Sequence, residues 1–281
     1  MNTARPDLLN AASRLLGPCE TARFAGGQVP GAVLRVRDRT GREFIVKRHC
    51  SMEQYHREVA AYRTWAPALA DRAPALVAAD PGARVIVITA IPGRPCPEPG
   101  SPSEHRQAGA LLRLLHEAEP ARRLTGFRQW LDHRVRSWRE RADPLLAPAD
   151  RALIDRHLSV LARFDAPLGG PAHLDYQPRN WLADRDGTLR VIDFEHARID
   201  VQARDFVRLA FRYWSGRAGL RAAFLAGYGR ELTSSEWQIV ESCAAIDVVT
   251  ALGRGVATGN HQLTSHGQAT LRLLHLHEVP A

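Results

Sequence analysis

The alternation of apolar and polar residues over the first ninety positions predicts a small β-sheet. Strand-like segments occupy residues 21–24, 32–37, 43–48, 76–79 and 84–89. The second and third are joined by Asp38-Arg-Thr-Gly41, a hairpin signal. Ser51 can cap a helix that runs to about Trp65. We therefore expect a five-stranded antiparallel sheet with one helix, preceded by a short amphipathic helix over residues 7–16.

The pattern changes after a Pro/Gly-rich connection over residues 91–100. Helical periodicity follows over residues 103–118, 126–142, 149–164, 203–230, 234–257 and 262–278, with a strand–loop–strand segment over 168–192. No internal repeat is present. The sequence therefore predicts an α+β fold with two lobes, a small β-rich lobe over residues 1–92 and a larger, mainly helical lobe over residues 93–281.

Composition excludes several classes of protein. Hydrophobic residues make up 45% and charged residues 24% of the 281 positions, as in ordinary globular proteins. The longest apolar runs are too short to span a bilayer, and no apolar stretch follows a basic start at the N-terminus. The four cysteines are scattered, which favours reduced thiols. We expect a cytoplasmic protein with no membrane partner.

The basic charge does not indicate a nucleic-acid partner. The formal net charge is +8, but residues 1–95 carry 14 basic and 8 acidic side chains and residues 96–281 carry 24 and 22. The arginines are interleaved with acidic and apolar residues, and no nucleic-acid-binding motif is present. No obligate protein partner is evident either. Of the 38 Lys and Arg residues only Lys47 is lysine, so this position calls for a specific explanation.

The densest polar cluster in an apolar context is His173-Leu-Asp-Tyr-Gln-Pro-Arg-Asn180, which a predicted hairpin separates from Asp193-Phe-Glu195. Phosphoryl transfer needs one carboxylate to orient and deprotonate a hydroxyl, and an amide and a second carboxylate to hold Mg²⁺. Asp175, Asn180 and Asp193 offer these three groups at loop positions near strand ends. The alternative is that the three residues only form turns, because Asp and Asn are common in loops. Turn formation alone would not require the spacing that these three residues have.

This spacing resembles the catalytic and metal loops of kinase-fold enzymes. The resemblance implies a protein kinase-like fold, with Asp175 as the catalytic base and Asn180 and Asp193 as Mg²⁺ ligands. It also implies a strand lysine, a helix glutamate and a glycine-containing turn upstream. Lys47 supplies the first and Glu58 the second, as an ion pair that contacts nucleotide phosphates; a mere surface pair is the alternative.

Other residues receive roles from the same resemblance. The turn is Phe24-Ala-Gly-Gly-Gln-Val-Pro-Gly31, in which Gly26 and Gly27 approach the phosphates, although it is not a Gly-x-Gly-x-x-Gly. Backbone groups near Ala90 and Ile91 would hold the base of ATP, with GTP not excluded. His173 and Asp205 would support the catalytic loop. Glu195 contacts the acceptor or metal-bound water, or is simply solvated; both alternatives stay open.

The branch of the kinase fold follows from details around these loops. Gln177 and Glu195 stand where protein kinases carry Lys and Gly, and no Ala-Pro-Glu segment follows. The chain instead resembles the aminoglycoside phosphotransferase and choline kinase-like enzymes, which phosphorylate hydroxyls of small molecules. The helix segment Gly109-Ala-Leu-Leu-Arg-Leu-Leu-His116 and Ala203-Arg-Asp205 are similar to that family. Leu174 and Gln177 depart from its common Gly and His, but neither position supplies the base or a metal ligand.

The acceptor is predicted only as a class. The last 81 residues hold six acids, Asp205 included, and several aromatic residues, which suits a neutral, ring-bearing acceptor better than a polycation. We expect a hydroxylated antibiotic such as a capuramycin-like nucleoside, a macrolide or an aminoglycoside, inactivated by phosphorylation. The alternatives are a metabolic kinase of the choline/ethanolamine, homoserine or sugar type and a catalytically silent nucleotide-binding module.

Overall fold

The computed structural model describes residues 4–22, 32–164 and 166–278. They form two compact units. Unit 1 comprises Met1–Pro120, Pro171–Arg198 and Ala222–Arg230, and unit 2 comprises Ala121–Gly170, Ile199–Arg221 and Glu231–Ala281. Among the described residues no helix is long and apolar enough to cross a bilayer. The predicted boundary between a β-rich lobe over residues 1–92 and a helical lobe over residues 93–281 stays a prediction.

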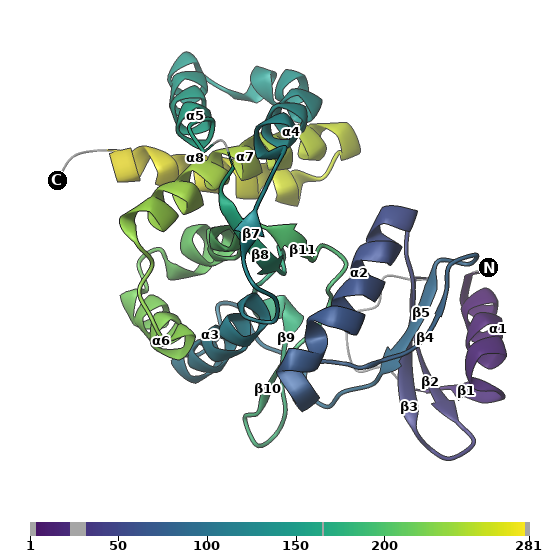
Figure 1. Ribbon diagram of the computed structural model, residues 1–281. Helices are drawn as coiled ribbons and strands as arrows, with labels where there is room; N and C mark the ends of the chain where they lie inside the picture. Colours follow the sequence, from purple (N-terminus) through teal and green to yellow (C-terminus); the bar gives the residue numbers. More distant parts are fainter. Residues whose placement is uncertain (1–3, 23–31, 165, 279–281) are drawn as a thin grey trace. The chain divides into compact units, whose positions relative to one another are not determined.

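Unit 1 contains a five-stranded antiparallel sheet, as the sequence predicts (Figure 1). Its strands are β1 (Cys19–Thr21), β2 (Val33–Asp38), β3 (Glu43–Arg48), β4 (Leu76–Asp80) and β5 (Val85–Thr89), in the order β1-β2-β3-β5-β4. The register pairs Val33 with Lys47 and Lys47 with Ile86. Strand β3 therefore lies in the middle of the sheet. The first strand begins two residues earlier than predicted, and the end predicted for it lies outside the described residues.

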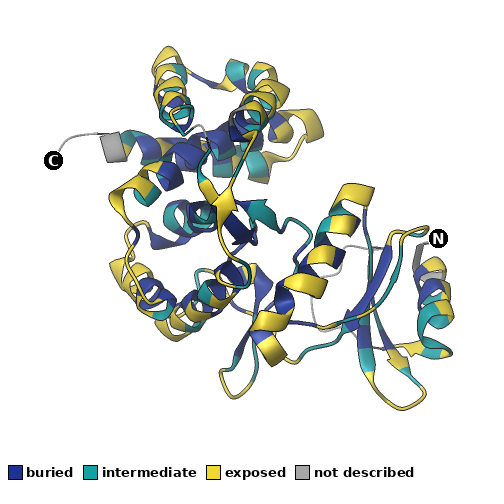
Figure 2. Cartoon of the chain, viewed as in Figure 1, coloured by how far each residue is buried: buried dark blue, intermediate teal, exposed yellow. Residues whose placement is uncertain are grey.

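The two faces of this sheet have different roles. Helix α1 (Ala4–Leu16) packs on one face, where Leu8 and Ala12 contact the cluster that holds Leu34 and Val46 (Figure 1). Successive side chains of a strand point to opposite faces. Lys47 therefore lies on the other face, the one that helix α2 covers. Figure 2 shows the central strands buried and the outer side of α2 exposed.

Helix α2 (Met52–Thr64) begins and faces inward for local reasons. The Ser51 hydroxyl accepts a hydrogen bond from the backbone N–H of Gln54, which satisfies one of the free N–H groups at the helix start. Its buried residues are spaced at three and four positions, so they form one face: Tyr55, Glu58, Val59 and Tyr62, with Ala61 beside them. Glu58 is the charged residue on this buried face and requires a partner there.

Unit 1 also contains helices and a second, smaller sheet. Helix α3 (Pro102–His116) starts with a capping box between Ser101 and Glu104. A 3-10 helix (Ala66–Arg72) precedes β4, and β6 (Arg94–Pro95), β9 (Trp181–Ala183) and β10 (Leu189–Val191) form a second sheet. Strands β9 and β10 form a hairpin, which confirms part of the predicted strand–loop–strand segment.

Gly109 allows α3 to approach α6 (Ala218–Tyr228) closely. A Cβ at position 109 would lie 2.1 Å from the Phe224 carbonyl oxygen and 2.8 Å from the Tyr228 nitrogen. We expect Gly109→Ala to lower the free energy of unfolding by about 2–3 kcal/mol, because two backbones must separate. Gly219→Ala on α6, where nothing lies within 4 Å, serves as control and is expected to be neutral or mildly stabilising. Urea unfolding checks both, and equal losses would contradict the close approach.

His105 is a buried titratable group on α3. Its side chain is fully buried, and neither ring nitrogen has a hydrogen-bond partner in the described part of the chain. The rings of Trp181 and Phe224 pack edge-on against it at 5.2 and 6.2 Å. Burial lowers the pKa of His105 to about 4 and outweighs the charge of Glu104. The folded protein therefore keeps this histidine neutral.

This burial predicts a loss of stability in acid. The unfolded chain takes up a proton on His105 near its ordinary pKa of 6.5, whereas the folded chain takes it up only near 4, so the free energy of unfolding falls as the pH drops between these values. The contribution is no more than about 1.4 kcal/mol per pH unit. The free energy of unfolding of His105→Phe, measured by urea titration, should therefore rise relative to that of the wild type as the pH is lowered. His133→Phe, at an exposed position, should not; an equal gain would refute the prediction.

Unit 2 is mainly helical. It contains α4 (Phe127–Ala142), α5 (Pro148–Leu161), α7 (Ser234–Thr258), α8 (His261–Glu278), strand β7 (Arg122–Arg123) and most of the short strands β8 (Leu168–Ala172) and β11 (Arg198–Asp200). Strand β8 pairs with β7, so the segment predicted as strand–loop–strand over residues 168–192 contains three strands, of which β9 and β10 form the predicted hairpin. The helices predicted at 126–142, 149–164, 234–257 and 262–278 are all present.

The continuous helix predicted near residues 203–230 is wrong. The segment consists of a 3-10 helix (Gln202–Phe206), a π-helix (Leu209–Trp214) and α6, with Ser215–Arg217 between the last two. Gly216 has a φ of +69°, which interrupts the helix in the left-handed region that glycine adopts easily. The apolar periodicity continues through this break, which is why the pattern alone did not reveal it.

Candidate active site

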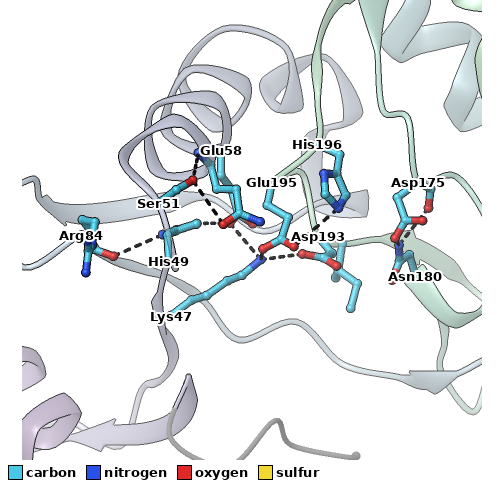
Figure 3. A network of polar contacts seen from close by, with 12 residues as sticks. Lys47, His49, Ser51, Glu58, Arg84, Asp175, Asn180, Asp193, Glu195 and His196 are labelled. Carbon is cyan, nitrogen blue, oxygen red and sulfur yellow. Dashed lines mark hydrogen bonds and ion pairs between the residues drawn. The ribbon is translucent and has the colours of Figure 1, made fainter. Parts of the chain in front are cut away.

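Lys47 is the centre of a polar network within unit 1. Its ammonium lies 2.9 Å from Glu58 Oε2, 2.5 Å from Asp193 Oδ1 and 2.9 Å from Glu195 Oε2 (Figure 3). Strand β3 supplies the lysine, α2 supplies Glu58, and the segment after β10 supplies the other two carboxylates. The Lys47 side chain is only 14% exposed. The structure thus brings together four of the residues to which the sequence assigns a role.

The electrostatics of this network keep Lys47 and Asp193 charged. Burial opposes the charge of Lys47, but Glu58, Asp193 and Glu195 outweigh it and hold the pKa of Lys47 well above its ordinary value. Burial likewise opposes the ionisation of Asp193, but the Lys47 ammonium and its hydrogen bond lower the pKa of that carboxyl below its ordinary value. Lys47 is therefore an ammonium and Asp193 a carboxylate at neutral pH.

His49 joins the network from the same face of the sheet, two residues after Lys47. Its Nε2 lies 2.5 Å from Glu58 Oε2 and its Nδ1 3.2 Å from the carbonyl oxygen of Arg84. His49, Glu58 and Glu195 have ligand atoms within 4.8 Å of one another. The Lys47 ammonium contacts both carboxylates, so we interpret this group as an ion-pair network and not as a metal site.

The Asp193 loop has a constrained backbone. Asp193 has a φ of +71°, in the left-handed region that an aspartate adopts more readily than most residues. The next residue, Phe194, is fully buried, with ring centroids 5.2 Å from Tyr62 and 4.9 Å from His173. The aromatic side chain anchors the loop between α2 and the 173–180 segment, while the carboxylate before it faces Lys47.

The Asp175 carboxylate is held by three nitrogen donors from its own loop. Gln177 Nε2 donates to Oδ1 at 2.5 Å, and Arg179 and Asn180 donate to Oδ2 at 3.0 and 2.8 Å. The side chain is only 2% exposed. The 3-10 turn over Pro178–Asn180 reverses the direction of the chain, so that the side-chain amide of Asn180 faces the Asp175 carboxylate. This arrangement fixes the orientation of a buried carboxylate and provides the charge that burial requires.

The segments that carry Asp175 and Asp193 are connected through the backbone of Ile192. Its N–H donates to the Asn180 carbonyl at 3.0 Å, and its carbonyl accepts from His173 Nε2 at 3.1 Å. His173 is fully buried and thus joins the start of one loop to the start of the other. Leu174 next to it has a φ of +62°, so the position where the resembled family has glycine keeps a left-handed backbone in this chain.

The donor set fits Mg²⁺. Both amide hydrogens of Asn180 are in use, one on the Asp175 carbonyl oxygen and one on its carboxylate, each at 2.8 Å. The amide orientation therefore leaves the Asn180 side-chain oxygen for a cation. Asp193 is ionised, and Mg²⁺ prefers such hard oxygen ligands together with phosphate oxygens and water. Asn180 and Asp193 are thus the residues that could hold this ion.

The structure describes one of the two segments predicted to contact the nucleotide, residues 90–91, but not the other. Gly26 and Gly27 lie outside the described residues. The N–H of Ala90 donates to the Glu43 carbonyl at 3.1 Å, which continues the β3–β5 pairing past its last residue. The next N–H along, that of Ile91, has no partner in the part of the chain that the structure describes. The backbone here therefore offers an edge to a planar ligand.

Asp205, the remaining predicted residue, is only 2% exposed and belongs to the 3-10 helix of unit 2. Its predicted support of the catalytic loop stays a prediction. Sequence reasoning did not identify His49, nor the contacts of Gln177 and Arg179 with Asp175. The strand period places His49 beside Lys47, and Arg179 lies four residues after Asp175, so these signals were present in the spacing.

Comparisons with known proteins agree with this geometry. A family model described as the phosphotransferase enzyme family (APH) matches residues 20–240. A search of the curated proteins gave no match. Similar solved structures include a choline/ethanolamine kinase family protein from Mesorhizobium loti, with 19% identity, 99% of this chain and 96% of the other covered, and a TM-score of 0.69.

Two further structures have the same fold. The macrolide 2'-phosphotransferase MphH from Brachybacterium faecium is 17% identical, with 98% of each chain covered and a TM-score of 0.62. An APH(2") protein, solved with GDP and kanamycin, is 14% identical, with 96% and 98% covered and a TM-score of 0.70. At these identities the likeness establishes the two-lobed protein kinase-like fold. Because the family model spans most of its length, the chain belongs to the phosphotransferase enzyme family.

Proposed function

We propose that this protein transfers the γ-phosphate of ATP or GTP to a hydroxyl group of a small molecule. The observation that carries the proposal is the Lys47 ammonium held between Glu58 and Asp193, in the same unit as a buried Asp175 carboxylate. Phosphoryl transfer requires few covalent steps from the protein and depends on positioning and charge. These residues supply a cation for phosphates and a carboxylate for the acceptor hydroxyl.

Each residue has one role in this proposal. Lys47 binds the α- and β-phosphates, and Glu58 holds its ammonium in place. Asp175 orients the acceptor hydroxyl and accepts its proton, while the backbone at Ala90 and Ile91 binds the base. Asn180 and Asp193 hold Mg²⁺, which when bound would offset the negative charge of the phosphates.

A neutral acceptor with rings is the substrate class we favour. Several acids of unit 2 are already paired with arginines: Asp143 and Asp155 with Arg139, and Asp200 with Arg204. A polycation needs unpaired carboxylates, and such pairing reduces the negative potential that would attract it. This supports a hydroxylated antibiotic of nucleoside or macrolide type, inactivated by phosphorylation, over an aminoglycoside.

A metabolic kinase is the second candidate. Glu195, which replaces the glycine of protein kinases, contacts Lys47 and is 24% exposed, so it could also face a cationic headgroup such as that of choline. A silent nucleotide-binding module is the third, and the complete set of catalytic residue types speaks against it. The four cysteines are free thiols, which supports a cytoplasmic location for each candidate.

The test is a screen of nucleotide consumption over a panel of acceptors. The panel contains nucleoside, macrolide and aminoglycoside antibiotics together with choline, ethanolamine, homoserine and sugars, each with ATP or GTP and Mg²⁺. We expect turnover with a neutral antibiotic and a product that mass spectrometry shows to carry one added phosphoryl group. Turnover of kanamycin-type compounds with failure of nucleosides and macrolides would contradict the acceptor class. Nucleotide binding without any transfer would leave the silent module.

A further inference from the structure

Arg179 contacts the predicted base in an unusual way. Its Nη2 donates to Asp175 Oδ2 at 3.0 Å. Within the part of the chain that the structure describes, this guanidinium makes no other hydrogen bond or ion pair. Arginine–carboxylate pairs are frequently bidentate. Here the second place on Oδ2 is taken by Asn180, and Oδ1 accepts from Gln177. The carboxylate therefore leaves Arg179 with a single contact.

The rest of this guanidinium faces outward. The Arg179 side chain is 59% exposed, whereas the Asp175 side chain is 2% exposed. A guanidinium has five N–H donors in a rigid fork, so four of them stay available beside the carboxylate. A planar fork of donors next to a catalytic base fits the oxygens of a phosphoryl group.

The chemistry of phosphoryl transfer calls for such a cation. As the acceptor oxygen forms a bond to the γ-phosphorus, the bond from that phosphorus to the bridging oxygen breaks. The electron pair leaves with the nucleoside diphosphate, and the hydroxyl proton passes to the Asp175 carboxylate. Negative charge is spread over the three non-bridging oxygens in this transition state. The Lys47 ammonium is buried and contacts three carboxylates, and the proposed function assigns it to the α- and β-phosphates and not to the group in transit.

We propose that Arg179 is a catalytic residue whose free guanidinium nitrogens bind the non-bridging oxygens of the transferring phosphoryl group while one nitrogen stays on Asp175. This inference rests on the proposed phosphotransferase function. It assigns to this chain's own loop a charge-stabilising contact that Lys47 does not provide.

The test compares Arg179→Ala and Arg179→Lys with the wild type in steady-state phosphoryl transfer. We expect Arg179→Ala to lower kcat by about 100- to 1000-fold, with KM for the nucleotide changed by less than about threefold. Arg179→Lys should recover part of kcat, because an ammonium still binds phosphate as a point charge. Guanidinium ion at millimolar concentration should raise the kcat of Arg179→Ala, whereas sodium chloride of equal ionic strength should not.

A matched control tests whether any exposed arginine on a buried aspartate behaves in this way. Arg42 pairs with Asp38 across the same four-residue spacing, with side chains 73% and 9% exposed, in the β2–β3 turn. Arg42→Ala should leave kcat unchanged. Thermal melts of all variants establish that they fold.

A second readout separates contact with the phosphoryl group from orientation of Asp175. Replacing ATP by ATPγS alters the transferred group itself. If Arg179 touches that group, the effects of the thio substitution and of Arg179→Ala are not multiplicative. Multiplicative effects, or a folded Arg179→Ala with wild-type kcat, would overturn the assignment.

The outcomes distinguish this assignment from the function on which it rests. If the wild type transfers phosphate and Asp175→Asn does not, while Arg179→Ala keeps its kcat, the role of Arg179 fails and the proposed function stands. If the wild type transfers phosphate to no acceptor in the panel, both fail.

Discussion

Asp175→Asn is expected to lower phosphoryl transfer at least about 1000-fold while nucleotide binding persists. The amide can neither accept the hydroxyl proton nor carry the negative charge that Arg179 and Asn180 face. It also places an NH₂ group against three N–H donors, so one donor at least loses its acceptor. Lys47 and Glu58 do not contact Asp175 in any hydrogen bond or ion pair of the described residues, so the Lys47 ammonium, to which we assign phosphate binding, stays in place.

The measurement pairs an acceptor-phosphorylation assay with calorimetric titration of the nucleotide. Asp184→Asn is the matched control: Asp184 also accepts from several donors of its own turn, including Arg190 at 2.7 Å and the Thr188 amide at 2.9 Å, but lies in the β9–β10 hairpin. We expect this control to keep its kcat. Retained transfer in Asp175→Asn would remove Asp175 from the role of base.

Lys47→Met is expected to abolish activity and to lower the free energy of unfolding by about 3–5 kcal/mol. The substitution leaves the carboxylates of Glu58, Asp193 and Glu195 without the ammonium that all three contact, and the Glu58 side chain is only 1% exposed. Removal of one partner from a buried ion pair is costly because the other charge stays desolvated. Nucleotide affinity should fall together with stability.

The loss of stability has a pH signature with a defined sign. In the wild type, the lysine keeps the pKa of Asp193 below its ordinary value. Without the lysine, burial raises the pKa of the Asp193 carboxyl, so protonation in mild acid relieves the penalty. The difference in unfolding free energy between wild type and Lys47→Met should therefore narrow as the pH falls. A constant difference would contradict the ion-pair explanation.

Two further variants complete this experiment. Lys47→Arg keeps the charge, but its planar guanidinium must meet carboxylates that arrive from α2 and from the Asp193 loop, so we expect most of the stability to return and most of the activity to stay lost. Arg48→Met, at the neighbouring position of β3, serves as control and should have a small effect on both. Full activity of Lys47→Arg would show that a point charge is not required.

The sheet and α2 were predictable because each depends on local patterns. The Asp38–Gly41 turn, the alternation over residues 43–48 and the Ser51 cap all act within a few residues of themselves, and the structure has all three. The segment near residues 203–230 was mispredicted for the complementary reason. Its apolar residues keep a helical period, while the break depends on the backbone of one glycine, Gly216.

The site was predictable in its residue types and not in its contacts. Spacing placed Asp175, Asn180 and Asp193 in loops, and the solitary lysine pointed to Lys47. Nothing in the sequence indicated that Glu195 would share this lysine or that His49 would contact Glu58. His49 and Glu58 lie 9 positions apart in the sequence, and Lys47 and Glu195 lie about 150 positions apart. Hydrophobic periodicity does not predict contacts between residues so separated.

The sequence by itself determined the small antiparallel sheet, most of the helices and the residue types that we assign to phosphoryl transfer. These follow from propensity, patterning and residue chemistry, which act locally. Only the tertiary structure decided how the charges are shared: three carboxylates around one ammonium, and three donors around one buried aspartate. Burial makes that sharing obligatory, because a desolvated charge must find its partners wherever the fold places them.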